Sequence, residues 1–479
     1  MEVFIDPGDR RGLTEQVYVQ VRDAIVDGRL VAGDVLTPSR TLAAELEISR
    51  FTVSEAYARL AAEGYVEGRR RGGTVVTSAI AATPQVPPRT AIQPLPLAAS
   101  ITPFDRDPTV TARHDLRAGV VDSSLFPLRA WRRCARAAME EAPPHYGAAP
   151  GADDLRAVLA HWIGRTRGVV ASGEEVVVTS GALHGMDLVA RVIVEPGDVV
   201  AVEEPGYPPA IDLLRAHGLN VVGVPVDADG LVVDAIPSSA RLVYVTPSHQ
   251  YPLGVVLSHE RRLHLLRWAA RHEATIVEDD YDSQFRYATR PLEPMQRLDP
   301  DGRVVYLGTF SKVLSPSLRI GFAVVPRSLV AAVSALRQAV DWCPPWPTQT
   351  TLTHLIVDGH LDRHIARATR QYRARRDEIV RRLRTSRVPV RLLPSSAGLH
   401  LAVLIDADES GDDRALHDAR VAEDLLLSSL RRCYRFSTAP GGLLLGFGGV
   451  QRDGVADALD ALDRVLVRVV TGADDVDAR

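Results

Sequence analysis

Lysine is almost absent from this chain of 479 residues, because Lys and Arg together number 56 and all of them except Lys312 are Arg. Cysteine is scarce as well. Its three positions, Cys134, Cys343 and Cys433, show neither the spacing of a metal site nor an even disulfide framework. No run of about 18 apolar residues occurs, and the first twelve residues lack the apolar core of a signal peptide. We therefore expect a cytoplasmic protein with no membrane span and no metal.

The charge balance excludes a further set of functions. A formal net charge of −4 makes it improbable that the chain coats nucleic acid or an anionic membrane over its whole surface, although a local basic patch stays possible. Hydrophobic residues make up 46% of the chain and charged residues 24%, which is typical of a globular protein. The length predicts roughly two to four domains.

The single lysine occurs in the stretch VVYLGTFSKVLSPSLRIGFAVVP, residues 304–326. Arg stays protonated at any working pH, whereas a desolvated Lys amine can lose its proton and condense with an aldehyde to a Schiff base. Because every other Lys or Arg position of the chain is Arg, Lys312 is a candidate for this chemistry. The alternative is a surface lysine that carries no chemistry, and the residue by itself does not decide between the two.

Composition divides the chain into three regions. Residues 1–77 are dense in short helical patterns, and residues 78–112 are rich in Pro, Ala and Thr, which predicts a semi-extended linker. In residues 113–479, β-branched runs such as VVVTS and ATIVEDD alternate with helical patterns. This alternation predicts an α/β domain with a mainly parallel sheet.

The first region has the spacing of a helix-turn-helix. Apolar residues fall on one face of residues 13–27, and two further short helices follow, with Ser39 and Ser49 as candidate caps and a tight turn at Glu47. Arg40 follows the first of these caps. Ser49, Arg50 and Thr52 face outward at the start of the second helix, where a recognition helix meets base edges and phosphates. A small helical oligomerisation module is the alternative.

A basic hairpin follows the second helix. Its tip contains Arg69, Arg70, Arg71 and Gly72, a composition that suits contact with a phosphate backbone. The whole segment resembles the winged helix of GntR-type bacterial regulators, in the stretches PSRTLA, SRFTV and AYARL and in the Gly-rich hairpin. It departs from that family at Thr37, Pro38 and Glu47. The resemblance implies binding to double-stranded DNA.

The third region contains the groups that a pyridoxal phosphate pocket needs: an amine, an anion for the ring nitrogen, a flat side chain over the ring, a phenol and donors for the phosphate. Each group follows a strand or begins a helix. Taken singly, each is more often an acidic loop, a core aromatic or an ordinary helix start. The candidates are Lys312, Asp279, Tyr281, Tyr207, Gly181, Ala182, Leu183, Thr309, Ser311 and Arg319.

Taken together, these residues resemble a fold-type I aminotransferase, and the whole chain resembles the MocR subgroup of GntR regulators. The likeness rests on stretches such as HYGAAPGADDLR, EEPGYP, TPSHQYPLG, VEDDYDSQF, GTFSKVLSPSLRIG and AGLHL. It implies a large mixed or parallel sheet with a small C-terminal α+β subdomain, and pyridoxal 5′-phosphate as the cofactor. It also implies a homodimer in which two chains pair head to tail, with each winged helix against the partner.

The resemblance assigns roles to the candidates. Lys312 would be the Schiff-base residue, and Asp279 would pair with the ring nitrogen. Tyr281 would lie near the ring oxygen and Tyr207 over the ring face. Ala182, Leu183, Ser311 and Arg319 would hold the phosphate. His249 and Gln250 stand where enzymes of the fold read Asn-Pro-Thr-Gly, and their role stays open.

The fold is compatible with three functions: a regulator that senses pyridoxal phosphate itself, a regulator that senses an amino acid or amine as an external aldimine, and an active aminotransferase. Family members that bind an α-carboxylate carry an Arg ahead of Leu-Gly-aromatic near the chain end, where this chain has Leu444. Arg431, Arg432 or Arg435 are possible substitutes. We therefore favour a regulator of vitamin B6 synthesis genes that senses pyridoxal phosphate, rather than an enzyme.

Overall fold

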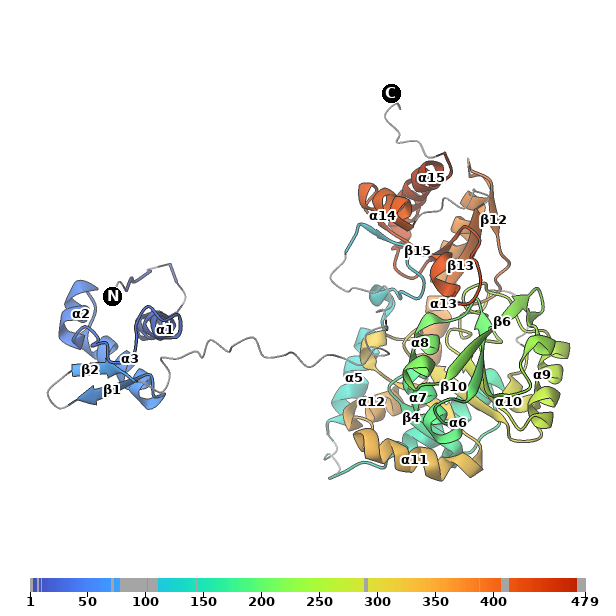
Figure 1. Cartoon of the computed structure of the whole chain (residues 1–479), viewed down its shortest axis with the longest axis horizontal. Coiled ribbons are helices and arrows are strands. Elements are labelled where there is room, and N and C mark those ends of the chain that lie inside the picture. Colours follow the sequence, from blue (N-terminus) through green and yellow to red (C-terminus); the bar gives the residue numbers. More distant parts are fainter. Residues whose placement is uncertain are drawn as a thin grey trace. The chain divides into compact units, whose positions relative to one another are not determined.

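The chain forms two compact units, Met1–Pro94 and Leu95–Arg479 (Figure 1). The computed structural model describes residues 3–6, 8–9, 11–69, 73–77, 101, 111–140, 142, 145–287, 292–386, 388–405 and 413–471. The division between the units falls inside the predicted linker, most of which lies outside the described residues. Within the described ranges, no helix is both long and apolar enough to cross a membrane.

The N-terminal unit is a winged helix. Its helices are α1 (Leu13–Val26), α2 (Ser39–Glu45) and α3 (Arg50–Ala62), and its hairpin is β1 (Val66–Arg69) with β2 (Gly73–Val76). The strands pair antiparallel. Apolar residues on one face of α1 and on one face of α3 are buried in a single core, which confirms the apolar face expected for residues 13–27.

The turn between α2 and α3 sets the angle of the recognition helix. Glu47, where a tight turn was expected, adopts the left-handed conformation with φ of 55°. Ser49 caps α3, because its side chain accepts a hydrogen bond from the backbone N–H of Thr52 at 3.1 Å. The expectation that Ser39 caps α2 is wrong. Pro38 holds that position without a side-chain cap, and Ser39 is the first helical residue.

The C-terminal unit is built on an eight-stranded mixed sheet with the order β4-β11-β10-β9-β8-β5-β6-β7. Its neighbours β10, β9, β8, β5 and β6 pair in parallel, whereas β11 runs antiparallel to both β10 and β4. The strands are β4 (Val176–Thr179), β5 (Val199–Glu204), β6 (Asn220–Asp227), β7 (Gly230–Leu231), β8 (Ala240–Val245), β9 (Thr275–Asp280), β10 (Val304–Thr309) and β11 (Gly321–Val324).

Helices cover both faces of this sheet, because successive strand residues point to opposite faces and both sets are apolar. One face packs against α7 (Ala182–Ile193), α8 (Pro208–Ala216) and α11 (Arg327–Asp341). The other packs against α6 (Asp153–Arg167), α9 (His259–Arg271), α10 (Met295–Leu298) and α12 (Trp346–Val357). The strand–helix alternation predicted from the sequence is thereby confirmed.

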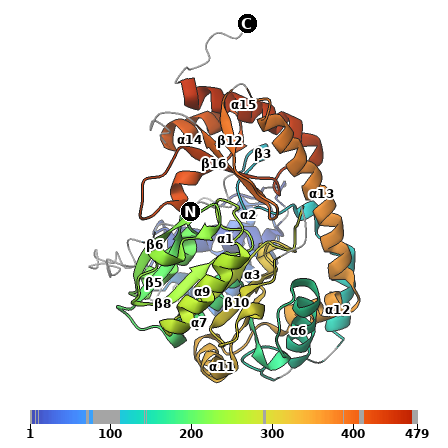
Figure 2. The same ribbon diagram turned by 90° about the vertical axis from the view of Figure 1, so that its right-hand side faces the viewer.

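A smaller α+β layer forms the C-terminal part of this unit. The helix α13 (His360–Leu383) runs along one side of the unit toward this layer (Figure 2). The four-stranded sheet has the order β12-β13-β16-β15. Its elements are β12 (Val390–Leu392), β13 (His400–Ile405), β15 (Ser428–Ser429) and β16 (Gly442–Gly446), with helices α14 (Asp413–Ala422) and α15 (Val455–Thr471). A parallel pair, β3 (His114–Asp115) with β14 (Leu425–Leu426), ties the start of the unit to it.

Strand direction decides where functional side chains gather. The carboxyl ends of β4, β5, β8, β9 and β10 all meet at one edge, because these five strands point the same way. Loops at such an edge carry ligand sites in α/β proteins, since backbone groups there are not used by the ladder. The candidate residues of the sequence analysis lie at or just after the ends of β4, β5, β9 and β10, and Arg319 lies in the short loop into β11.

Candidate functional site

One pocket lies at this edge of the large sheet, and all ten cofactor candidates from the sequence line it. They come from four stretches that are far apart in the chain: 181–183, 207, 279–281 and 309–319. The lysine comes from the turn after β10, the carboxylate from the end of β9, and the small residues from the start of α7. The fold therefore brings together every residue that the sequence analysis grouped by chemistry.

Lys312 lies in the turn that follows β10 and is half-buried. Its Nζ donates a hydrogen bond to the carbonyl oxygen of Gly119 at 2.7 Å. Gly119 belongs to the segment that leads from β3 into the unit, so the amine is held inside the pocket rather than in bulk solvent. A half-buried amine at a pocket wall is in position to react with a bound carbonyl group.

Asp279 lies on β9 and is 5% exposed. Its Oδ2 accepts a hydrogen bond from the hydroxyl of Tyr244 at 2.7 Å, and its Oδ1 is buried without a partner among the described groups. Burial raises the pKa of Asp279 to about 7, and the Tyr244 hydrogen bond opposes this only in part. A buried carboxyl oxygen with no partner is costly, so this side chain is suited to a ligand donor that enters the pocket.

The start of α7 forms the opposite end of the pocket. Gly181 precedes the helix with φ of 124° and ψ of 175°, and the first backbone N–H groups of α7 have no acceptor one turn earlier. A β-carbon added to Gly181 would stand 3.5 Å from Nη2 of Arg319 and 3.8 Å from Oγ1 of Thr309. Thr309 in turn donates to Oγ of Ser311 at 3.0 Å. Backbone, hydroxyl and guanidinium donors thus converge on one anion-sized position.

Aromatic side chains form the remaining wall. Tyr207 precedes α8, and its ring contacts that of Tyr251 edge-on, with centroids 5.3 Å apart. Tyr251 also meets Tyr281 at 6.1 Å. The hydroxyl of Tyr281 lies 3.0 Å from both the backbone oxygen and Nδ1 of His249. Three tyrosine rings therefore contribute to the wall of the pocket that also holds Lys312 and Asp279.

Sequence reasoning missed eight residues of the pocket wall. Six of them lie in stretches that carry the resemblance: TPSHQYPLG and VEDDYDSQF hold three, GTFSKVLSPSLRIG holds one, and AGLHL holds two. Tyr244 lies inside an apolar strand, β8. Its phenol, on a strand that pairs with the strand of Asp279, was the signal that could have identified it. The eight are Gly119, Tyr244, Thr246, Tyr251, Asp282, Pro316, Leu399 and His400.

Leu444, which stands in the place of the carboxylate-binding Arg, is 1% exposed and packs in an apolar cluster with Tyr251 and Ala402. None of the three suggested substitutes, Arg431, Arg432 and Arg435, lines the pocket. Arg435 instead pairs with Asp212 at 3.2 Å. Among the described residues, Lys312 and Arg319 are the only Lys or Arg side chains in the pocket wall.

The winged helix presents its own candidate surface. Arg40 and Arg50 are exposed, and Thr52 and Ser49 exchange a hydrogen bond between their hydroxyl oxygens at 2.9 Å at the start of α3. Arg69 ends β1 and pairs with Glu67 at 3.0 Å. Ser39 is half-buried as the first residue of α2. The predicted contacts Arg70, Arg71 and Gly72 lie outside the described residues.

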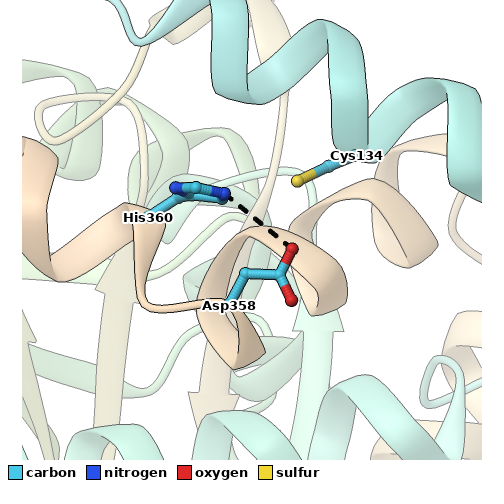
Figure 3. Close-up of side chains that lie close together, drawn as sticks. All are labelled: Cys134, Asp358 and His360. Carbon is cyan, nitrogen blue, oxygen red and sulfur yellow. Dashed lines mark ion pairs between the residues drawn. The ribbon is translucent and has the colours of Figure 1, made fainter.

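A second cluster of titratable side chains lies between α5 (Leu128–Ala138) and the junction of α12 with α13. It joins Cys134 to Asp358 and His360, as Figure 3 shows. The guanidinium groups of Arg133 and Arg363 each contact one ring nitrogen of His360. Burial and these two charges lower the pKa of His360. A cation would meet two guanidinium groups here, so the cluster is not suited to a metal ion.

A winged helix linked to an aminotransferase-like pocket defines a class of protein, the DNA-binding transcription factor with a cofactor-type effector domain. The comparisons agree with this class. The family model for bacterial regulatory proteins of the gntR family matches residues 13–76, and that for aminotransferase class I and II matches residues 115–439. The chain belongs to the MocR subfamily of GntR-type regulators.

Two relatives match almost the whole chain. The probable rhizopine catabolism regulatory protein MocR of Rhizobium meliloti is 34% identical over 93% of this chain and 92% of its own length. The pyridoxine biosynthesis transcriptional regulator PdxR of Corynebacterium glutamicum is 31% identical over 95% of this chain and 96% of its own length. The domain order is therefore shared with known regulators.

Solved structures resemble the C-terminal unit. The kynurenine aminotransferase of Pyrococcus horikoshii, solved in complex with PMP, is 26% identical and superposes with a TM-score of 0.69. It covers 78% of this chain and 93% of its own length. The α-aminoadipate aminotransferase LysN of Thermus thermophilus, which holds N-(5'-phosphopyridoxyl)-L-leucine, gives a TM-score of 0.68 over 75% of this chain. The large sheet with its small C-terminal layer is thus a fold-type I aminotransferase fold, as predicted.

Proposed function

We propose that this regulator binds pyridoxal 5′-phosphate in the pocket of its C-terminal unit and that pyridoxal phosphate itself is the effector, through which the protein controls genes of vitamin B6 synthesis. The observation that carries the proposal is the cation content of the pocket wall. Its only Lys and Arg among the described residues are Lys312 and Arg319, and the cofactor would use both. Within the described part of this wall, no third Lys or Arg is left for the carboxylate of an amino acid.

The pocket fits the cofactor at both ends. The unpartnered Oδ1 of Asp279 suits a protonated ring nitrogen, because an N–H donor there would satisfy a buried acceptor. The donors around Gly181 suit a phosphate, and a β-carbon at that position would fill the space in front of Arg319. Pyridoxal phosphate supplies an aldehyde that condenses with a primary amine, and Lys312 is the only lysine of the chain.

Each remaining residue of the pocket would then bind the cofactor or orient it. Ala182 and Leu183 would offer backbone N–H groups, and Thr309 and Ser311 their hydroxyls, to the phosphate. Tyr207 would cover one face of the ring, and Tyr281 would lie near its oxygen. Tyr244 holds the Asp279 carboxyl in place through its 2.7 Å hydrogen bond. All of these residues line the pocket, which is the geometric support for their roles.

The small number of Lys and Arg side chains in the pocket wall also favours sensing over transamination. Efficient transamination needs a firm hold on the substrate carboxylate as well as a proton-carrying lysine. The apolar packing of Leu444 and the engagement of Arg435 with Asp212 remove the expected sources of that hold from this wall. We therefore expect turnover of amino acids to be slow compared with that of the aminotransferases that share the fold.

The alternative function is the sensing of a small amine or amino acid by the protein with its cofactor bound. The name of the relative from Rhizobium meliloti, which refers to rhizopine catabolism, favours this alternative. An amine without a carboxylate would not need a third cation. Tyr251, Leu399 and His400 extend the pocket wall beyond the residues proposed to hold the cofactor, and an amine effector would contact them.

We also propose that two copies of the chain form a dimer. Tyr146 and Trp342 stack on each other with centroids 4.8 Å apart, yet they are 64% and 55% exposed. A stacked aromatic pair left on the surface is typical of a protein–protein contact. Sedimentation equilibrium of the full chain would give twice the monomer mass, and a monomer at micromolar concentration would overturn the proposal.

A DNA-binding titration separates the candidate functions. The probes are a duplex selected in vitro by the full-length protein and the region upstream of its own gene. Pyridoxal phosphate alone is expected to change the affinity or the footprint of the cofactor-free protein. A response that appears only when an amino acid or amine is added to the cofactor-loaded protein would favour the alternative. A transaminase assay with common amino acids under the same conditions tests for enzymatic turnover.

A further inference from the structure

A buried histidine lies directly behind the pocket wall. His249 follows β8, is 2% exposed, and does not itself line the pocket. Its ring nitrogens contact three side chains: Tyr281 and Asp282, which lie in the pocket wall, and Ser395, from the loop before β13. The likeness to aminotransferases left the role of His249 open. The hydrogen bonds around its ring allow its protons to be placed.

The first proton is on Nε2. This nitrogen lies 3.1 Å from Oγ of Ser395. The single hydroxyl proton of Ser395 is used in a 2.9 Å hydrogen bond to the backbone oxygen of Ala397. Since Ser395 can then only accept from the imidazole, Nε2 must donate.

The second proton lies between Nδ1 and Asp282. The two carboxylate oxygens of Asp282 stand 3.1 and 3.2 Å from Nδ1, and Asp282 is 1% exposed. Two lone pairs would repel at this distance, so one proton must lie between them. Imidazole is the more basic of the two groups, and the proton therefore belongs to the ring. The result is an imidazolium–carboxylate pair.

The surroundings are compatible with a positive charge on His249. The neighbouring ring of His400 has its centroid 4.8 Å away, and its Nε2 contacts the backbone oxygen of Pro252 at 3.1 Å. Burial, and then the charge of His249, lower the pKa of His400 far below its usual value, so this ring stays neutral. Lys312 faces His400 from the pocket side. Among the described residues, Asp282 supplies the carboxylate that contacts the His249 ring.

The pair is buried and tightly packed. Gly398 has φ of 80°, and a β-carbon on it would stand 2.2 Å from Cε1 of His249 and 2.4 Å from Oδ2 of Asp282. The backbone N–H of Leu399 also points to Oδ2, at 3.3 Å. The loop before β13 thus closes over the pair, and a buried pair without water interacts strongly.

We infer that His249 is a positioning residue that acts on the bound cofactor through Tyr281. Burial raises the pKa of Tyr281 well above its usual value, so the phenol keeps its proton. That proton is donated to the backbone oxygen of His249 at 3.0 Å, since Nδ1 already carries one. Because its proton is used in this hydrogen bond, the oxygen of Tyr281, which lies in the pocket wall, can act only as an acceptor toward a bound group. The inference rests on the proposed cofactor function.

The test is a pH titration of the visible absorption of the full-length protein loaded with pyridoxal phosphate. His249→Gln and His249→Asn remove the imidazolium charge and leave the Asp282 carboxylate, which should disfavour the deprotonated form of the bound cofactor. We expect the titration midpoint to rise by about one pH unit or more in both variants. His264→Gln is the matched control, because His264 lies on α9, pairs with Asp234 and does not line the pocket. Its midpoint should stay at the wild-type value.

A second pair of variants separates action through Tyr281 from general damage. In a Tyr281→Phe background, His249→Gln should cause a clearly smaller shift than in the wild-type background, since only the direct effect of the lost charge remains once the hydroxyl is absent. A midpoint that stays at the wild-type value in both folded His249 variants would overturn the inference while leaving the proposed cofactor function intact. Failure of the wild-type protein to bind pyridoxal phosphate would instead overturn the proposed function. Thermal unfolding identifies variants that are not folded. If only one of the two His249 variants folds, that variant is sufficient for the test.

Discussion

Arg319 reaches across to Gly181, so that a β-carbon on Gly181 would stand 3.5 and 3.6 Å from the two terminal nitrogens of the guanidinium. Strand pairing produces this approach. β11 lies between β10 and β4, with Gly321 opposite both Thr309 and Thr179. The left-handed conformation of Arg319, with φ of 48°, then turns its side chain back over the start of α7. One anion position is thus built from two loops that are distant in the sequence.

Gly181→Ala should weaken cofactor binding without touching the lysine. The backbone at Gly181, with φ of 124° and ψ of 175°, belongs to a region that only glycine adopts readily, and strain there costs about 1–3 kcal/mol. We expect the Kd for pyridoxal phosphate, measured by fluorescence titration, to rise at least about tenfold. Gly197→Ala is the control. Gly197 also has positive φ, at 97°, but has open space and lies outside the pocket wall, so only stability should fall.

Lys312→Ala should abolish covalent attachment of pyridoxal phosphate. Reduction of the loaded protein with borohydride, followed by peptide mass spectrometry, should place the label on the peptide that contains Lys312, because no other lysine exists in the chain. Lys312→Arg keeps a cation near the oxygen of Gly119 but has no reactive amine, and it should remain unlabelled. Stoichiometric labelling of either variant would show that the lysine is not the attachment point.

The stability of the cofactor-free protein should fall as the pH rises from about 4 to about 7. Burial raises the pKa of both Asp279 and Glu203 to about 7, so the folded protein keeps protons that the unfolded chain has released. When the folded state binds more protons than the unfolded state, the free energy of unfolding decreases as the pH increases. Glu203→Gln should flatten this fall in the thermal unfolding temperature. An identical pH profile in the variant would contradict the assignment of Glu203.

Arg50→Ala should weaken DNA binding by about 1–3 kcal/mol, because Arg50 is exposed as the first residue of the recognition helix. If it contacts a phosphate, the slope of log affinity against log salt concentration should also fall by about one. Arg59→Ala is the control from the same helix. Arg59 is paired with Glu15 and Glu63 and lies over the ring of Tyr18, so it serves the fold. Equal losses in the two variants would argue against a specific role for Arg50.

Phe51→Ala should change base preference rather than stability. Phe51 is the second residue of α3 and is 75% exposed, so its ring is available to thymine methyl groups in a major groove. Replacement of thymine by deoxyuridine in the selected duplex should weaken wild-type binding about fourfold at a contacted position, and the variant should be insensitive to it. Thermal unfolding should be nearly unchanged. A variant that still distinguishes thymine from deoxyuridine would place Phe51 away from the bases.

Local patterns were sufficient for the elements of the fold. Runs such as VVVTS and ATIVEDD specified strands because both of their faces are apolar, and Ser49 was identified as a cap because its hydroxyl replaces a missing backbone acceptor. The error at Ser39 has the same origin. Both Pro38 and Ser39 suit a helix start, and the fixed φ of Pro38 together with the path of the preceding chain decided which of them stands outside the helix.

The amino-acid sequence by itself determined the inventory: one reactive amine, the acidic strand end at Asp279, the glycine before α7 and the outward residues of α3. Tertiary structure alone decided that Asp279 keeps an unpartnered oxygen, that Arg319 closes over Gly181, and that His249 lies between Tyr281 and Ser395. The reason is physical. Residue type and local periodicity are properties of a segment, whereas desolvation, charge pairing and the direction of a side chain depend on which distant segments pack around it.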